Sequence, residues 1–145
     1  MSQTGVQARR SAVSLLDKVI GEGRLMSELT GAGALDHLEP EDRARAQRLA
    51  LETLRGIERA DRILQKHLAK YPPLTVRNTL RLATIELCAG GAAHGVVNAA
   101  VEIVGRNKRT ASMKGLVNAV LRKVAANGQE VWPSLRVPRL PKWLR

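Results

Sequence analysis

The sequence contains little that could build a covalent or aromatic framework. Its 145 residues include one cysteine, Cys88, no phenylalanine and only 2% aromatic residues. A single cysteine excludes an internal disulfide and a cysteine-rich zinc site. The scarcity of aromatic side chains argues against the stacking platforms on which single-strand nucleic-acid binders place bases. If RNA binds, we expect phosphate contacts and shape to carry the recognition.

Signals for a membrane or for secretion are also missing. No apolar run reaches the ~18 residues that a membrane span requires. The segment from Met1 to Arg10 lacks the apolar core of a secretory signal. We therefore expect a cytoplasmic protein that has no membrane partner.

Residues that bind metals or carry catalysis are scarce as well. His37, His67 and His94 lie far apart in sequence and lack the spacing of metal ligands. The glycine-rich segment Gly90–Gly95 follows a helical pattern and not a strand, so it predicts a helix–helix turn and not a phosphate-binding loop. We assign no catalytic and no metal-binding residue, and we predict that this chain alone is not an enzyme.

Two further kinds of reactive side chain have ordinary explanations. Cys88 lies within an apolar helical pattern, which favours a small buried hydrophobe over a reactive thiol. Glu86 and Glu102 are single acids on separate predicted helices. We expect each of them to be an ion-pair partner of a basic residue and not a catalyst.

Helical periodicity runs through almost the whole chain, and strand signals are nearly absent. Gly56 is expected to kink or divide the longest segment, which Tyr71-Pro72-Pro73 should end. Asn127-Gly128 should end the last helix. Short connections favour a compact all-α bundle. The expected helical segments run from about Val6 to Ile20, Leu25 to Leu29, Glu39 to Tyr71, Leu74 to Ala89, His94 to Gly105 and Ser112 to Ala126.

Positive charge dominates the composition and is concentrated near the C-terminus. The chain has 24 Lys and Arg against 13 Asp and Glu, a net charge of +11. Residues 1–102 carry 14 basic and 12 acidic side chains, whereas residues 103–145 carry 10 basic and 1 acidic. A nearly neutral body with a strongly basic last third indicates a polyanionic partner on one face.

Two groups of basic residues are candidates for RNA contacts. One lies in the first expected helix, and the other lies around the turn between the last two expected helices, His94 to Gly105 and Ser112 to Ala126. Lys and Arg side chains near helix starts bind phosphate groups. The alternative is a solvated cationic surface, but the near-absence of acids in the last third favours RNA. The predicted RNA-binding residues are Arg9, Arg10, Arg106, Lys108, Arg109 and Lys114, with Arg122 and Lys123 as weaker candidates.

A second set of arginines, on the long third segment, has a different pattern. These residues lie opposite the apolar stripe and alternate with acids, since Glu41 precedes Arg45 by four positions and Glu58 precedes Arg62 by four. Opposite charges at this spacing stabilise the solvent-facing side of a helix. We expect that structural role for most of them.

Asn98 and Asn118 interrupt apolar helical stretches. A buried amide needs hydrogen-bond partners. We expect each of them to bond a neighbouring helix end or loop, with direct RNA contact as the minority option.

The start of the last helix carries the most specific motif. Residues 114–122 read KGLVNAVLR, which resembles the K-G-[FL]-[VI]-N-x-[VI]-L-R signature of NusB-like domains. Residues 8–12, 54–64, 80–87 and 94–102 resemble further family motifs in the same order. Departures from the family pattern include Ala93 where proline often precedes the histidine, Ala99 for a glutamate and Glu52 for a glycine. These changes affect local loop shape more than family membership.

The resemblance is in particular to the N-terminal domain of bacterial 16S ribosomal RNA cytosine-C5 methyltransferases of the Sun/Fmu type. It implies an all-α NusB-like bundle of about seven helices in two packed sub-bundles. Residues 1–128 would form the RNA-binding domain, and residues 129–145 a basic, extended tail or linker with proline and tryptophan. In those methyltransferases a P-x-W-L segment, here Pro141 to Leu144, leads into the catalytic domain. The resemblance therefore implies that S-adenosylmethionine binds in a missing C-terminal methyltransferase domain and that this chain holds no cofactor.

Two other functions remain open. A stand-alone NusB factor for transcription antitermination pairs with a ribosomal protein and binds leader RNA, although its motif usually ends Leu-Asp where residues 121–122 read Leu-Arg. Alternatively, the basic face docks intramolecularly on an acidic catalytic domain. In that case the isolated chain would bind RNA weakly and without selectivity.

Overall fold

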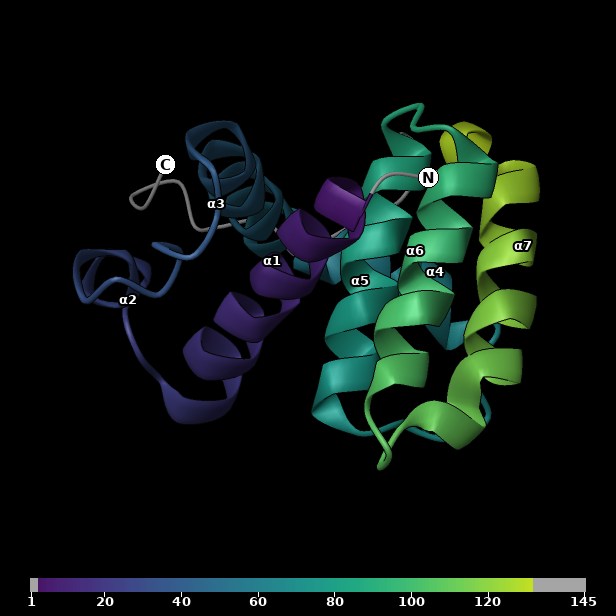
Figure 1. Ribbon diagram of the computed structural model, residues 1–145. Coiled ribbons are helices and arrows are strands. Elements are labelled where there is room, and N and C mark those ends of the chain that lie inside the picture. Colours follow the sequence, from purple (N-terminus) through teal and green to yellow (C-terminus); the bar gives the residue numbers. More distant parts are fainter. Residues whose placement is uncertain (1–2, 132–145) are drawn as a thin grey trace, which may run out of the picture.

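The protein is an assembly of helices joined by short connections (Figure 1). The computed structural model describes the backbone of residues 3–131 and the side chains of residues 5–126, and this part contains no strand. The all-α fold and the number of helices confirm the prediction. The elements are α1 (Gln3–Glu22), α2 (Met26–Gly31), α3 (Pro40–Arg55), α4 (Ile57–Gln65), α5 (Leu74–Cys88), α6 (Ala93–Arg106), the short 3-10 helix η1 (Ala111–Met113) and α7 (Lys114–Val131).

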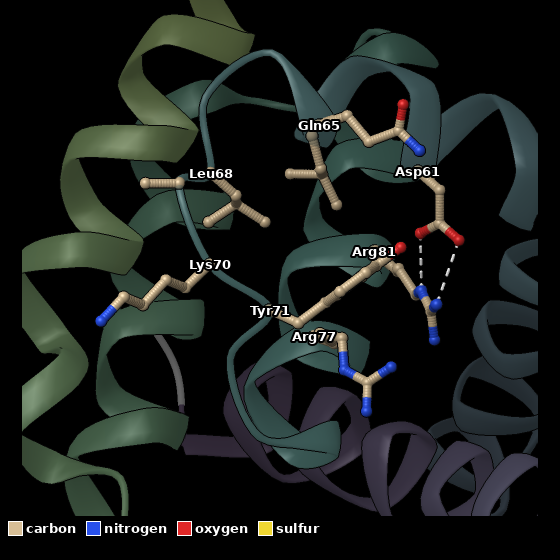
Figure 2. Close-up of a pocket in the computed structure, with 9 residues that line it drawn as sticks. Asp61, Gln65, Leu68, Lys70, Tyr71, Arg77 and Arg81 are labelled. Atoms are coloured by element: carbon tan, nitrogen blue, oxygen red, sulfur yellow. Dashed lines mark hydrogen bonds and ion pairs between the residues drawn. The ribbon is translucent and has the colours of Figure 1, made fainter.

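The long third segment consists of two helices that meet at Gly56. Pro40 begins α3 with acids in its first turn, which suits the positive end of a helix. Gly56 has φ −103° and ψ 13°, outside the helical region, so the helix divides there as expected. The expected end at Tyr71 is wrong, because α4 already stops at Gln65. The chain then continues without helix past Leu68 and Tyr71 (Figure 2).

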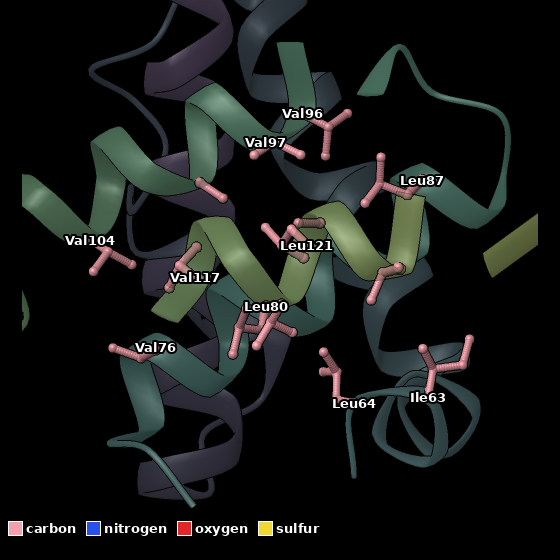
Figure 3. Packing of buried hydrophobic residues seen from close by; sticks show 14 residues of the cluster. Ile63, Leu64, Val76, Leu80, Leu87, Val96, Val97, Val104, Val117 and Leu121 are labelled. Atoms are coloured by element: carbon pink, nitrogen blue, oxygen red, sulfur yellow. The ribbon is translucent and has the colours of Figure 1, made fainter. Parts of the chain in front are cut away.

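Two large hydrophobic cores, besides a small third cluster between α1 and α6, confirm the two packed sub-bundles. One core joins α1, α2 and α3, with Leu16, Leu29 and Leu49 among its members. The other joins α4 to α7 and contains Leu80 and Leu121 (Figure 3). Helix α5 contributes to both cores and is buried along most of its length, so it is the element that unites the molecule.

The turn between α5 and α6 is a helix–helix connection, as predicted. Gly90 has φ +91°, a left-handed conformation that favours glycine at the end of a helix. The Gly91 N–H donates to the carbonyl of Glu86 at 2.8 Å, and a Cβ at Gly91 would lie 2.8 Å from that same oxygen. Gly90 therefore allows the left-handed backbone conformation of the turn, and Gly91 allows its backbone to pack closely against the end of α5.

Helix α7 continues through Asn127-Gly128 as far as Val131, the last residue whose backbone the structure describes. The expected helix end at these residues is therefore wrong. A single glycine in a helix costs only about 1 kcal/mol, which does not end a helix by itself. The tail beyond Val131, including Trp132 and Trp143, lies outside the described residues.

Candidate nucleic-acid interface

Arg9 is part of the core and not of the surface. Its side chain is 7% exposed, and it lies two turns into α1. Its Nε and Nη2 donate to the two carboxylate oxygens of Glu86 on α5 at 2.8 and 2.9 Å, and its Nη1 donates to the Gly5 carbonyl at 3.4 Å. The structure thus corrects the placement of Arg9 on the RNA face and confirms Glu86 as an ion-pair partner.

Arg10 points the other way, toward the turn that joins α6 to η1. It lines a hollow of about 530 Å³ together with Arg106, Lys108 and Arg109. All four side chains are exposed. We call these four residues the basic cluster; it brings together cations from segments almost a hundred residues apart in sequence.

The turn that carries the basic cluster is held by its own hydrogen bonds. The buried Thr110 donates through Oγ1 to the Val104 carbonyl at 2.7 Å, which ties the turn to the last turns of α6. The Arg109 N–H donates to Oδ1 of Asn107 at 2.9 Å. Lys108 and Arg109 are therefore presented on an ordered backbone, which reduces the entropy lost when they bind.

One acid, Asp17, lines the hollow among the described residues, and its carboxylate is already engaged. One oxygen accepts a hydrogen bond from Thr75 Oγ1 at 2.7 Å and the other from Asn78 Nδ2 at 2.8 Å, both on α5. Because Asp17 is held toward α5, the outer part of the hollow is dominated by positive charge. Such a surface attracts and positions phosphate groups.

Arg106 and Lys114 connect the basic cluster to a neighbouring hollow. Arg106 pairs with Glu102 one turn earlier on α6, which confirms the expected role of that acid. The Lys114 stem lies over Gly105, since a Cβ at Gly105 would meet Lys114 Cδ at 2.7 Å. Lys114 and Arg106 both line this second hollow. Lys114 thus borders the cluster and also packs α7 against α6.

Arg122 and Lys123 lie elsewhere. Arg122 donates from Nε to Asn118 Oδ1 at 3.1 Å and lines a separate hollow with His94. Lys123 lies close enough to His67 to influence it: burial, then Lys123 and Lys66, hold the pKa of His67 below its ordinary value of 6.5. The structure does not bring Arg122 or Lys123 to the hollow beside Arg10.

The two asparagines do not bridge to neighbouring helices. Asn98 is exposed, and its Nδ2 lies 3.1 Å from His94 Nε2 on the same helix. Asn118 is half-buried and bonds Arg122, again one turn away. The expected contacts with helix ends are therefore wrong, because both amides lie toward the outer side of their own helices.

The arginines of α3 and α4 have the expected solvent-facing character, with different partners. The ion pair on this face joins Arg48 to Glu52 at 3.8 Å. Glu41–Arg45 and Glu58–Arg62 are not among the ion pairs of the described residues. Asp61 of α4 forms a shorter ion pair with Arg81 of α5, in which Arg81 Nε lies 2.7 Å from Asp61 Oδ1.

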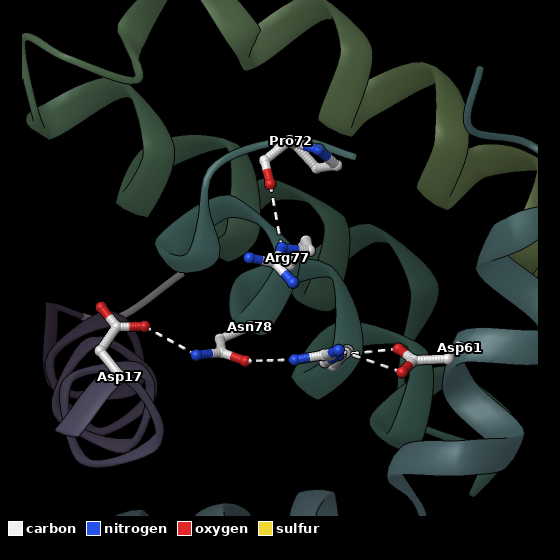
Figure 4. Close-up of polar contacts among 6 residues, drawn as sticks. Asp17, Asp61, Pro72, Arg77 and Asn78 are labelled. Carbon is white, nitrogen blue, oxygen red and sulfur yellow. Dashed lines mark hydrogen bonds and ion pairs between the residues drawn. The ribbon is translucent and has the colours of Figure 1, made fainter. Parts of the chain in front are cut away.

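A chain of polar contacts ties the two sub-bundles together, and sequence reasoning missed it (Figure 4). Asp17 of α1 accepts from Asn78, whose Oδ1 accepts from Arg81 Nη1 at 3.0 Å. Arg81 also donates from Nε and Nη2 to the two oxygens of Asp61 on α4, at 2.7 and 3.0 Å. Asn78 and Arg81 are buried on α5. The chain fixes α1, and Arg10 with it, relative to α5 and α4.

A further polar hollow of about 400 Å³ adjoins the basic cluster through their shared residue Arg10. Ser14 and Lys18 line it from α1 and His37 from the connection before α3. Ser11 Oγ lies 3.1 Å from His37 Nε2. Sequence reasoning did not include Ser14 and Lys18 in the candidate site, although their spacing of four and eight residues from Arg10 already places all three on one side of a helix.

Metal-binding and thiol chemistry receive no support from the described part of the chain. Within it, no three potential metal ligands come together. Burial raises the pKa of the half-buried Cys88 thiol to about 11, which disfavours the reactive thiolate. None of the described helices is both long and apolar enough to cross a membrane.

Comparison with known proteins gives one match. The sequence matches the NusB family over residues 6–126. No curated protein and no solved structure gave a match. The matched segment begins within α1 and ends within α7, so it includes both sub-bundles. Since it covers most of the sequence, the chain belongs to the NusB family.

Proposed function

We propose that this protein binds RNA through the basic cluster of Arg10, Arg106, Lys108 and Arg109. The observation that carries the proposal is that these four exposed cations line one hollow although Arg10 is almost a hundred residues away from the other three in sequence. Membership of the NusB family supports RNA as the polyanion. Lys114 borders the same surface and extends it toward α7.

The basic cluster would position RNA by its phosphates. Guanidinium groups donate paired hydrogen bonds to phosphate oxygens, and a lysine on a fixed turn adds a point charge. Such contacts set the register of the RNA and do not read its bases. Each neutralised phosphate also releases counterions, so affinity must fall as salt rises.

We further propose that the chain is the RNA-recognition domain of a ribosomal RNA cytosine-C5 methyltransferase. The support comes from sequence: residues 121–122 read Leu-Arg, and Pro141 to Leu144 resembles the P-x-W-L segment that leads into the catalytic half of such enzymes. Methyl transfer from S-adenosylmethionine belongs to that separate domain in this proposal. This chain's residues contribute by holding 16S ribosomal RNA so that a cytosine reaches the reacting centre.

The rival function, transcription antitermination, uses an RNA-binding surface on the same family of domain. The two functions differ in the RNA and in the protein partner. An antitermination factor would bind a leader RNA selectively, and a ribosomal protein would strengthen that binding. A domain that mainly docks on an acidic catalytic half would bind either RNA weakly and without preference.

The test compares the affinity of the full chain for 16S ribosomal RNA fragments and for a leader RNA, each with and without the ribosomal protein. We expect tighter binding to a 16S fragment and no effect of the added protein. Preference for the leader RNA, strengthened by the ribosomal protein, would favour antitermination. The absence of measurable RNA binding under low salt would contradict RNA binding altogether.

A further inference from the structure

The connection between α4 and α5 forms a hollow that is separate from the basic cluster. It has a volume of about 290 Å³ and is lined from α4 by Leu64, from the connection by Leu68, Lys70 and Tyr71, and from α5 by Arg77. Tyr71 is the single tyrosine of the chain, and this residue is 71% exposed. Its ring offers a large apolar surface that is open to a ligand.

Tyr71 is backed on one side by a positioned arginine. The guanidinium of Arg77 lies over the ring, with its carbon 5.2 Å from the ring centroid. Its Nε donates to the Pro72 carbonyl at 3.0 Å, which fixes the guanidinium in place. Figure 2 shows Arg77 and Leu68 on opposite sides of Tyr71. One face of the ring therefore lies toward the guanidinium of Arg77. The other face lies toward the apolar side chain of Leu68.

The charge around this hollow favours an anionic ligand. Asp61, which also lines it, accepts two hydrogen bonds from Arg81 and is thereby neutralised. The terminal nitrogens of Arg77 and the ammonium of Lys70 make no ion pair with any residue that the structure describes. A ligand would meet the apolar side chains of Leu64 and Leu68 inside the hollow and the guanidinium of Arg77 at its rim, whereas the ammonium of Lys70 extends away from Tyr71 (Figure 2).

This hollow and the basic cluster both involve the start of α5. Thr75 lines the hollow of the basic cluster, and Arg77 lines this one. Both residues belong to the first turn of α5, which begins at Leu74. Residues two positions apart project from nearly opposite sides of a helix, so the two hollows lie on different sides of the start of α5.

From this geometry we infer that the hollow binds one unpaired nucleotide of RNA. The base stacks on the open face of Tyr71 against Leu68, and its phosphate contacts the terminal nitrogens of Arg77. This inference rests on the proposed RNA binding and adds a base-binding site to a surface that otherwise contacts phosphates. It also means that the low aromatic content does not exclude stacking, because a single exposed tyrosine suffices for one base.

The test uses the full chain, a single-stranded RNA of about 12 nucleotides and the same sequence as a duplex. Tyr71→Ala should weaken single-strand binding about 5- to 150-fold, the range expected for loss of one stacked base. It should leave duplex binding unchanged, since paired bases cannot enter the hollow. Tyr71→Phe should keep the wild-type affinity, because it retains the ring. Leu25→Ala, at an exposed residue distant in sequence, is the truncation control.

The outcomes separate this inference from the proposed function. If the charge reversals Arg10→Glu and Lys108→Glu abolish RNA binding while Tyr71→Ala has no effect, the nucleotide site is wrong and the proposed function stands. An equal loss for single strand and duplex, or for Tyr71→Phe as well as Tyr71→Ala, would also overturn it. If Tyr71→Ala abolishes binding of a protein partner but leaves RNA affinity unchanged, the hollow binds a peptide and the nucleotide site is wrong. If wild type binds no RNA, both proposals fall.

Discussion

Arg9 of α1 and Glu86 of α5 form a two-pronged ion pair inside the protein, with side chains that are only 7% and 12% exposed. Two parallel hydrogen bonds, at 2.8 and 2.9 Å, match the planar guanidinium to the carboxylate. The pair joins the first helix to the helix shared by both cores. It orients α1 so that the next residue, Arg10, faces the α6–η1 turn.

Removing Arg9 should therefore destabilise the fold strongly. Arg9→Ala would leave Glu86 largely buried without its partner, and breaking a buried pair in this way costs about 3–5 kcal/mol. The matched control is Arg24→Ala, whose pair with Glu28 is 38% and 55% exposed and should contribute less than about 1 kcal/mol. Urea unfolding measures both. Equal losses for the two variants would contradict the structural role of Arg9.

Thr84 carries the one buried side-chain oxygen without a hydrogen-bond partner among the described residues. Thr84→Val removes this hydroxyl at nearly constant volume and should raise the free energy of unfolding by up to about 1 kcal/mol. The control on the same helix is Thr79→Val, which loses a 2.8 Å hydrogen bond to the Thr75 carbonyl. That variant should lose about 1 kcal/mol. Destabilisation by Thr84→Val would show that its hydroxyl has a partner.

His67 should report on the charge of Lys123. Burial comes first among the causes that lower the pKa of His67, and the charges of Lys123 and Lys66 follow. Lys123→Gln should therefore raise the pKa of His67 toward 6.5 without reaching it, because burial remains. Proton NMR titration of the imidazole measures this shift. Arg122→Gln, which changes the adjacent residue by the same charge, should leave the pKa of His67 in place.

The same shift has a consequence for stability. Since the folded pKa of His67 lies below its ordinary value of 6.5, the unfolded chain binds more protons just below that pH. The free energy of unfolding then decreases as pH falls through this range. Lys123→Gln should make that decrease shallower. A slope that is unchanged, or steeper, in the variant would contradict the coupling.

The sequence predicted the features that depend on local chemistry. Apolar periodicity placed the helices, and Gly56 and Gly90 marked breaks that the structure confirms. Prediction from sequence failed where a residue distant in sequence decides whether a side chain is buried or exposed. Arg9 and Arg10 are adjacent and chemically equal in sequence, and only the position of Glu86, far along the chain, makes one buried and the other exposed.

The polar chain through Asn78 and the exposure of Tyr71 were missed for a related reason. A buried asparagine among apolar residues gives no sign of which carboxylate it will meet, here Asp17. Tyr71 precedes two prolines and so indicated only a helix end, whereas α4 had already ended at Gln65. Both features depend on how α4, α5 and α1 pack, which periodicity does not specify.

The most direct test of the account is the salt dependence of RNA binding for wild type and for the double variant Arg10→Glu, Lys108→Glu. This pair is preferable to one that includes Lys114, whose stem also packs on Gly105. The control is Arg43→Glu, Arg55→Glu, an equal change of charge at exposed residues of α3. We predict that the first variant binds more weakly, with a shallower slope of log affinity against log salt, while the control keeps the wild-type slope. Equal affinity and slope for all three folded proteins would contradict the assignment of RNA binding to the basic cluster.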